Sequence, residues 1–569
     1  MEGSKKVKWG IFGIPWALCI ITIILNFAAG ESFNAGVMAI TNFIFADFGW
    51  LFCLMSFICV VMIAVAYILP FGRVRIGGRK AKPVMKMSNY VYIVLCTIMA
   101  AGILLWACAE PMYHYYGPPA HVTPESSDAI TFLMSDIFLE WTFTPLCIYG
   151  VPAILFAFLF YNCGKKYSVG SMLFPTLNDN MTEKVSPVVD VICLVALVCG
   201  MAASMGSAVF LIAEGGATLT GAFTSGPAAW IIVAVLIVGA FVISAVSGVM
   251  KGIRILSTWN SRIYFALGAF VFVFGPTVFC LSNTVEGFGD YLTNFAKISL
   301  FHSVADGDAW AAWWPVFYWC NWMAWMPVTS TFLGRLSKGY TVREAIQVIV
   351  IWPALFSVGW LGLFSSASLY YEMNGAGINE AMTNNGTAAA TYAVLQQMPI
   401  SVITIAVFLV IVFLAIVTAS DSNTNAMAGL CTGGLTQDDQ ESPTWLKVVW
   451  GATIGVMCII FILAFQSTDA LKYLSNLGGF PVVFLLIIIV FSFAKVIRNP
   501  YKYDLHKEDY DEHGQPIPSV RLKSEQEEMM EAKKKVAAAP AAAPAAAAEE
   551  APAQGNVPPL YTSNSFMKQ

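Results

Sequence analysis

The chain has 569 residues, of which 58% are hydrophobic and only 12% are charged. Soluble domains carry about 25% charged residues, so this composition excludes an ordinary soluble domain and is typical of an integral membrane protein. The net charge of −4 is uninformative as a total, and no nucleic-acid partner is expected.

Twelve runs are long and apolar enough to span a membrane, because a hydrocarbon core of about 30 Å needs about 20 helical residues. Lys5, Lys6 and Lys8 precede the first run, which has no cleavage site and is predicted to be a spanning helix rather than a signal peptide. The predicted spans are 9–30, 49–70, 90–109, 137–161, 187–213, 229–249, 263–283, 311–333, 345–371, 398–419, 447–465 and 474–496.

Basic residues separate the two sides of this predicted bundle. Four of the loops on one side carry almost all of them, whereas the opposite loops hold little beyond Lys297 and Lys472. The positive-inside rule therefore places both termini in the cytoplasm, in a multi-pass protein of the cell inner membrane. The residues that carry this asymmetry are Arg73, Arg75, Arg79, Lys80, Lys82, Lys86, Lys165, Lys166, Lys184, Lys251, Arg254, Arg262, Arg335, Lys338 and Arg343.

Two segments do not fit the pattern of spanning helices. The region 284–310 is too polar to span but keeps apolar residues at helical spacing, which predicts an interfacial helix on the outer face. Region 497–569 changes to charged and then Ala/Pro-rich sequence, which predicts a disordered cytoplasmic tail.

No catalytic motif is present. The sequence contains no P-loop, H-E-x-x-H or G-x-S-x-G pattern, and its 13 cysteines and five histidines show no metal-ligand or disulfide spacing. We therefore expect a transporter or channel without a cofactor rather than an enzyme.

Small and polar residues interrupt three predicted spans, at 98–102, 202–207 and 418–422. Broken helices of this kind often mark a site near the membrane midplane, although close packing through small residues is the plainer reading. Three acids also lie within or next to spans, and acids in lipid are costly unless paired or functional. Glu110 and Asp421 are predicted at helix ends, which makes Glu140 the more interesting of the three.

Aromatic residues gather in the eighth span, with five tryptophans at positions 313–325. Trp322 and Trp325 share a helix face at i, i+3. Trp141 and Tyr149 of the fourth span are eight residues apart, which predicts that they lie close to the same helix face. Such rings can form a cage for a quaternary ammonium. Trp313 and Trp314 are instead predicted to belong to an interfacial aromatic belt.

At 317–344 the chain reads FYWCNWMAWMPVTSTFLGRLSKGYTVRE. This word resembles the signature of the betaine–carnitine–choline transporter family, and Glu110-Pro111, Trp141-Thr142, SGVMKGIRILS at 247–257 and TASDS at 418–422 support the likeness. The resemblance implies twelve helices, two extra N-terminal ones (1–89) and a LeuT-like pair of inverted repeats, over 90–283 and 311–496. It also implies a homotrimer in the lipid bilayer.

The same resemblance implies site residues. Trp141, Tyr149 and Trp322 fall on positions of the family's aromatic box, Trp325 lies beside it, and Tyr113 matches a substrate-contacting tyrosine of the carnitine branch. Three departures from the pattern would shape the choice of substrate. Leu146 replaces a tryptophan, Asn321 replaces a tryptophan of the signature, and Glu140 replaces a histidine.

The coupling ion is less clearly indicated. Met99, Ser204, Thr418 and Ser420 match the region where the sodium-dependent branch holds its ions, whereas Ala203 and Ala419 replace hydroxyl residues. The resemblance implies a sodium symporter that imports glycine betaine, carnitine, choline or a related onium compound by alternating access. A sodium-independent antiporter of the carnitine/butyrobetaine type is the alternative, and an onium-binding membrane sensor is the alternative of another class.

Overall fold

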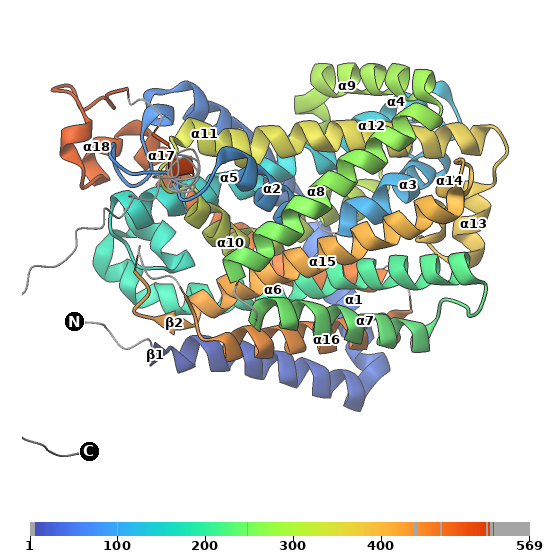
Figure 1. Ribbon diagram of the computed structural model, residues 1–569, viewed down its shortest axis with the longest axis horizontal. Helices are drawn as coiled ribbons and strands as arrows, with labels where there is room; N and C mark the ends of the chain where they lie inside the picture. Colours follow the sequence, from blue (N-terminus) through green and yellow to red (C-terminus); the bar gives the residue numbers. More distant parts are fainter. Residues whose placement is uncertain are drawn as a thin grey trace, which may run out of the picture.

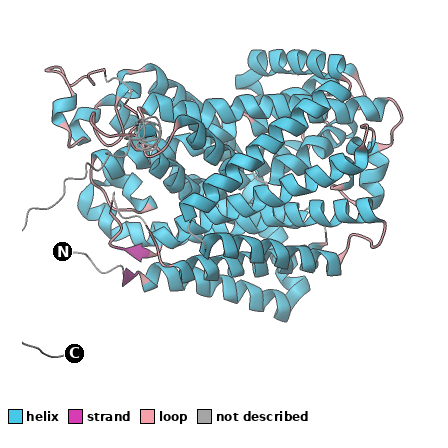
Figure 2. Ribbon diagram, in the orientation of Figure 1, coloured by secondary structure: helices cyan, strands magenta, loops and turns pink. Residues whose placement is uncertain are grey.

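The computed structural model describes residues 6–99, 101–246, 249–436, 441–466 and 469–518, together with 522, 523, 527 and 528. Ala100, part of the predicted signature at 247–257 and the Ala/Pro-rich stretch lie outside the described residues. The protein is a bundle of long helices with one two-stranded pair, β1 and β2, at the end where α18 also lies (Figures 1 and 2).

The elements of the first half are β1 (Lys6–Val7), α1 (Trp9–Ile68), η1 (Pro70–Arg73), α2 (Met87–Ile98), α3 (Ala101–Tyr116), α4 (Ser127–Trp141), α5 (Phe143–Ala157), η2 (Phe158–Asn162), η3 (Val169–Leu173), α6 (Phe174–Thr220), α7 (Pro227–Val246), α8 (Val249–Phe274) and α9 (Thr277–Ser299).

The elements of the second half are η4 (Ala312–Val316), α10 (Phe317–Leu336), α11 (Val342–Ile346), η5 (Gln347–Ile351), α12 (Trp352–Met373), α13 (Ile378–Asn385), α14 (Ala389–Gln396), α15 (Ser401–Leu430), β2 (Thr432–Gly433), α16 (Thr444–Phe465), α17 (Asp469–Arg498), α18 (Pro500–Tyr503) and η6 (Lys507–Asp509).

The predicted fold class, an all-α multi-pass membrane protein, is confirmed, but the count of twelve spans is not. Eight helices of the described chain are long and apolar enough to cross a membrane, or ten if each of two bent helix pairs is one span. The predicted spans 9–30 and 49–70 both fall almost entirely within α1, whose helix is kinked at the non-helical backbone of Ala29, near the end of the first predicted span. The range 311–333 falls mainly in α10, whose rings and hydroxyls make it less apolar than those helices.

The chain bends by 110° between α8 and α9. Gly275 and Pro276 lie at the bend, and a proline disfavours helical backbone in the residue before it. The predicted span 263–283 is therefore wrong, because it runs across this bend. The helix predicted within 284–310 is present but begins earlier, at Thr277, and packs against α4 and α12.

Helix α15 is longer than predicted. It continues past the predicted end at 419 to Leu430, so Asp421 lies inside the helix and is fully buried rather than at a helix end. Lys8 donates from Nζ to the Leu430 carbonyl at 3.2 Å, and β1 pairs with β2 directly after α15. The N-terminus is thereby attached to the end of α15.

The residues after α17 begin as a folded segment, residues 499–518, which we call the C-terminal cap. Asp504 accepts hydrogen bonds from Asn162 Nδ2 at 2.9 Å and from the Tyr510 hydroxyl at 2.8 Å. Asn162 also donates to the Arg75 carbonyl, and the Arg79 amide donates to Asp509. The cap therefore joins the loop after α1 to the end of η2.

The core of the bundle is built around α10. This helix packs against α5, α6, α15 and α17, and 19 of its 20 residues are buried. Asn321 is the one that keeps partial exposure. The aromatic residues of α10 and Asn321 therefore lie at the centre of the bundle.

Candidate functional site

The segment predicted as the fourth span is interrupted between two site residues. Helix α4 ends at Trp141, Thr142 has non-helical backbone (φ −111°, ψ −113°), and α5 begins at Phe143. The prediction that Trp141 and Tyr149 share one helix face is therefore wrong, because no continuous helix joins them. Both rings nevertheless contact Trp322 of α10, since the break turns the end of α4 toward it.

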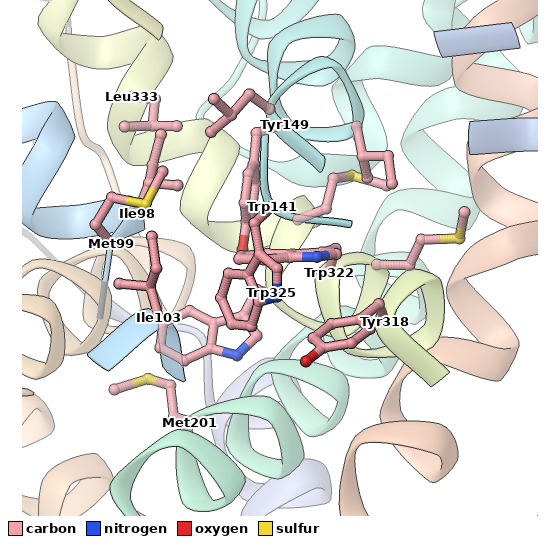
Figure 3. Packing of buried hydrophobic residues seen from close by; sticks show 14 of the residues in the cluster. Ile98, Met99, Ile103, Trp141, Tyr149, Met201, Tyr318, Trp322, Trp325 and Leu333 are labelled. Atoms are coloured by element: carbon pink, nitrogen blue, oxygen red, sulfur yellow. The ribbon is translucent and has the colours of Figure 1, made fainter. Parts of the chain in front are cut away.

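Four rings from α4, α5 and α10 form an aromatic cluster, which we call the aromatic box. The Trp322 ring lies 5.4 Å from Trp141 and 5.9 Å from Tyr149, at interplanar angles of 87° and 83°. Tyr318 contacts Trp141 at 5.1 Å and 70°. In each edge-to-face pair the edge of one ring covers one face of the other, so a cation would have to bind where Trp141, Tyr318 and Trp322 line a cavity. Figure 3 shows these rings close to Trp325, with Ile98, Met99 and Ile103 to the left of them.

A cavity of about 50 Å³ lies against this box. Its walls come from α2, α3, α4, α6, α10 and α17, and they combine rings, aliphatic side chains and a few small polar groups. The lining residues are Ile98, Gly102, Ile103, Trp106, Trp141, Ala203, Ser204, Ser207, Phe317, Tyr318, Asn321, Trp322, Trp325 and Ser475. Rings with a few convergent polar groups are the lining that small-molecule sites favour, but about 50 Å³ is far below the roughly 300–1,000 Å³ of such sites, so the walls must move apart to admit a substrate.

One wall of the cavity depends on a glycine. A Cβ atom at Gly102 would lie 3.1 Å from the Trp141 ring, which is tighter than ordinary contact. The small residue in the interrupted stretch at 98–102 therefore lets α3 approach the aromatic box closely.

Asn321 supplies the polar end of the cavity. Its Oδ1 accepts a hydrogen bond from Ser475 Oγ at 2.9 Å, which ties α10 to α17. A carboxylate only accepts hydrogen bonds, so the amide N–H groups are the part of Asn321 that can serve a ligand carboxylate.

Behind the box lies a group of buried ionisable residues, Glu110, His114, Asp136 and Glu140, which we call the acid–histidine cluster. Glu110 Oε2 accepts hydrogen bonds from Trp141 Nε1 at 3.0 Å and from the Tyr318 hydroxyl. Glu110 lies in the interior of α3 and is 1% exposed, so its predicted place at a helix end is wrong.

Histidine 114 lies between two carboxylates of this cluster. Its Nε2 is 3.7 Å from Glu110 Oε1 and 3.4 Å from Asp136 Oδ2. One side-chain oxygen of Glu140 lies within 4.8 Å of both Glu110 and His114. Sequence analysis missed Glu110 as a partner of the box, and His114, Asp136 and Tyr318 altogether. The i, i+4 spacing of Glu110 and His114 in an apolar segment was the available signal.

Several predicted site residues lie away from the cavity wall. Glu140 contributes its backbone carbonyl, which accepts from Trp322 Nε1 at 3.1 Å, while its side chain belongs to the acid–histidine cluster. Leu146 is buried in α5, and Tyr149 reaches the box through Trp322. Tyr113 donates to or accepts from Thr387 Oγ1 at 3.1 Å and lines a separate cavity. Their roles with substrate stay predictions.

The predicted ion-binding residues are spread over three helices. Ser204 of α6 lines the cavity. Met99 ends α2, and its carbonyl accepts from the Tyr264 hydroxyl at 3.4 Å. Thr418 Oγ1 donates to the Leu414 carbonyl at 2.7 Å, and Ser420 Oγ is buried with no hydrogen-bond partner in the described part of the chain. Sodium binding by these residues stays a prediction.

The predicted aromatic belt is wrong for Trp314. Its ring is 7% exposed and packs 4.4 Å from His114 and 5.4 Å from Tyr113, inside the protein. Trp313 is half-buried against Phe45 at 5.2 Å. The tryptophan-rich stretch thus continues the aromatic box toward the acid–histidine cluster.

Comparison with solved structures finds a similar chain in a Na⁺-coupled sialic acid symporter in a substrate-bound outward-open state. The TM-score is 0.42 at 13% sequence identity, over 78% of this chain and 87% of that one.

Comparison with characterised sequences finds transporters. The chain is 28% identical to an ectoine/hydroxyectoine transporter of Virgibacillus pantothenticus, over 86% of this chain and 97% of that protein. It is 26% identical to a probable glycine betaine transporter of Desulfitobacterium hafniense, over 88% and 99%. The family model for BCCT, the betaine/carnitine/choline family transporters, matches residues 10–502. The chain therefore belongs to the betaine/carnitine/choline transporter family.

Proposed function

We propose that this protein imports a quaternary ammonium or related onium compound across the inner membrane by alternating access, with sodium as the coupling ion. Both termini are then cytoplasmic, as the distribution of basic residues predicts. The substrate class comprises glycine betaine, choline, carnitine and other compounds with a delocalised or substituted cationic group, such as ectoine. A homotrimer is the expected assembly.

The observation that supports this proposal is the aromatic box beside a buried cavity. A quaternary ammonium cannot donate hydrogen bonds, so ring faces are the protein groups that best replace its hydration. Trp141, Trp322 and Trp325 come from two helices and line the cavity together. Each ring contributes about 0.5–2 kcal/mol by cation–π attraction, which gives the moderate affinity that a carrier needs.

Uptake of radiolabelled choline, glycine betaine and ectoine into proteoliposomes tests the proposal, with a sodium gradient and with potassium in its place. We expect sodium-dependent accumulation of at least one compound. Failure of all three to accumulate or exchange would contradict import of this substrate class.

Sodium-independent antiport of the carnitine/butyrobetaine type is a second candidate function. It is favoured by Ala203, which lines the cavity, and by buried Ala419, because neither can offer an oxygen ligand from its side chain. Exchange of internal for external substrate without sodium would identify it.

A membrane sensor that binds onium compounds without moving them is the candidate of another class. Counterflow separates the two, because a sensor would bind the compound and yet show no exchange of labelled for unlabelled substrate.

A further inference from the structure

The acid–histidine cluster connects the aromatic box to a second cavity. This second cavity, of about 280 Å³, lies between α4, α9 and the segment before α10. Exposed Asp128 and Lys297 line it, so it is open to the surface, and Asp136 lines it from α4 while only 3% exposed. Asp136 is therefore the point where the buried cluster meets the solvent-accessible cavity.

The groups follow one another from this cavity to the box, with gaps slightly longer than a hydrogen bond on both sides of His114. Asp136 Oδ2 lies 3.4 Å from His114 Nε2, which lies 3.7 Å from Glu110 Oε1. The other Glu110 oxygen accepts from the indole of Trp141 at 3.0 Å and from Tyr318. Both distances at His114 are slightly longer than a direct hydrogen bond, so a small ring rotation or one water completes each step.

The surroundings make full ionisation of the cluster costly. Glu110, Asp136 and Glu140 bring three carboxylates to one imidazole, and the exposed fraction of each of these side chains is 4% or less. A buried carboxylate is costly unless it is paired or hydrogen-bonded, so a proton shared among these groups would lower the cost of burying them. Two other helices supply polar groups near the cluster: Tyr318 of α10, and Ser365 and Ser368 of α12, which donate to carbonyls of α3. The titratable groups that line the second cavity are His121, Asp128, Asp290 and Lys297.

We propose that Glu110, His114 and Asp136 form a proton relay between the second cavity and the aromatic box, and that protonation of Glu110 opposes binding of an onium cation in the box. The inference rests on the proposed function. A proton leaves the Glu110 carboxyl for His114 Nε2, and His114 passes a proton to the Asp136 carboxylate, which releases it to water in the cavity. Only O–H and N–H bonds form and break.

The sign of this linkage follows from charge. A cation bound against Trp141 stabilises the ionised form of Glu110, whose carboxylate accepts the indole N–H. An ionised Glu110 in turn increases the negative charge on the Trp141 ring face and so its attraction for the cation. Linkage is reciprocal, so protons must weaken cation binding by the same factor. The onium compound should therefore bind more tightly as pH rises, and its binding should release part of a proton.

Calorimetry of choline binding to the purified full chain tests the linkage without any variant. Choline carries a fixed positive charge, so pH changes act on the protein alone. We expect a binding enthalpy that differs between phosphate and Tris buffers at the same pH, which reports proton release. We also expect affinity to rise with pH by at most tenfold for each pH unit, since one proton is linked to binding.

Two outcomes separate this inference from the proposed function. Choline binding with a buffer-independent enthalpy and a pH-independent affinity would overturn the relay alone. Absence of binding by choline, glycine betaine and ectoine would overturn the proposed function and the relay with it.

Variants then locate the linked proton. Glu110→Gln should bind choline at all pH values with the weak affinity of the wild type at low pH, and release no proton. His121→Gln is the matched control, because His121 also pairs with a carboxylate, Asp306, at 2.6 Å beside the same cavity but does not belong to the cluster. The control should keep full proton release, and the reverse pattern would overturn the assignment.

The route is tested by rate. After a rapid pH jump, the tryptophan fluorescence of the choline complex should relax at least tenfold more slowly in Asp136→Asn than in the wild type. An unchanged rate would place the entry of protons elsewhere and overturn the relay.

Discussion

The aromatic box and the predicted sodium ligands occupy neighbouring regions of the molecule but differ in how their side chains are held. The box rings are fixed by each other and by defined acceptors, since Trp322 donates to the Glu140 carbonyl and Trp141 to Glu110. The hydroxyl of Thr418 instead bonds a carbonyl one turn earlier in its own helix. A ring cage is thus held in place by its own packing, whereas hydroxyl ligands can turn back on their own helix.

Because the two regions differ in how firmly their side chains are held, their geometry supports a functional assignment to different degrees. The rings, packed at nearly perpendicular angles beside a cavity, support the proposed cation site by their positions. The geometry of Met99, Ser204, Thr418 and Ser420 describes helix packing equally well, so functional measurements must test these four residues one by one.

Removal of Trp322 should have the largest effect. Trp322→Ala deletes a cation–π face and the edge-to-face contacts with Trp141 and Tyr149, about 3 kcal/mol together, which corresponds to about 100-fold weaker choline binding. Isothermal titration measures the change. Trp352→Ala is the matched control, because Trp352 is 51% exposed on α12. This variant should bind choline with the affinity of the wild type. Equal losses in both variants would show that the box has no special role.

The polar end of the cavity should discriminate between ligands. Asn321→Ala removes an amide that can donate to a carboxylate, so glycine betaine should bind about tenfold more weakly, while tetramethylammonium, which has no carboxylate, should be unaffected. Competition binding of the two compounds checks this. A loss of the same size for both would mean that Asn321 acts only through its bond to Ser475.

The predicted sodium ligands can be tested by measuring the effect of each variant on sodium dependence and on substrate affinity separately. Thr418→Val should raise the sodium concentration for half-maximal uptake about threefold to tenfold, as expected for one lost oxygen ligand, and leave the substrate affinity in saturating sodium unchanged. Ser204→Ala should raise both constants, because Ser204 lines the cavity. Uptake over a matrix of sodium and substrate concentrations gives the two constants. Identical behaviour of wild type and both variants would remove this ion site.

The smallest effect should come from the C-terminus. A chain that ends after residue 518 keeps the C-terminal cap and should match the wild type in uptake and melting temperature. A chain that ends after Arg498 loses the bonds of Asp504 to Asn162 and Tyr510 and should melt about 3 °C lower or more, with unchanged choline affinity. Equal melting temperatures would show that the cap adds no stability.

The sequence predicts the parts of this molecule that depend on local composition. Apolar runs mark most of the helices, and the word at 317–344 identifies the family and the rings of α10. The bend at Gly275 was missed, because hydropathy measures the length of an apolar run and not the direction of its axis. Glu110 was undervalued for a similar reason. Its partners Trp141 and Tyr318 are 31 and 208 residues away, and no periodicity within one helix shows such a contact.

The C-terminal cap also has a consequence for how the protein is made. Its bonds link Asp509 to Arg79 and Asp504 to Asn162, pairs that are 430 and 342 residues apart. This segment leaves the ribosome only after every preceding helix, so the loop after α1 has no cap until synthesis is nearly finished. Closure of the cap would then mark a complete chain, and a nascent chain that stalls before residue 499 would leave that loop open to quality-control proteases.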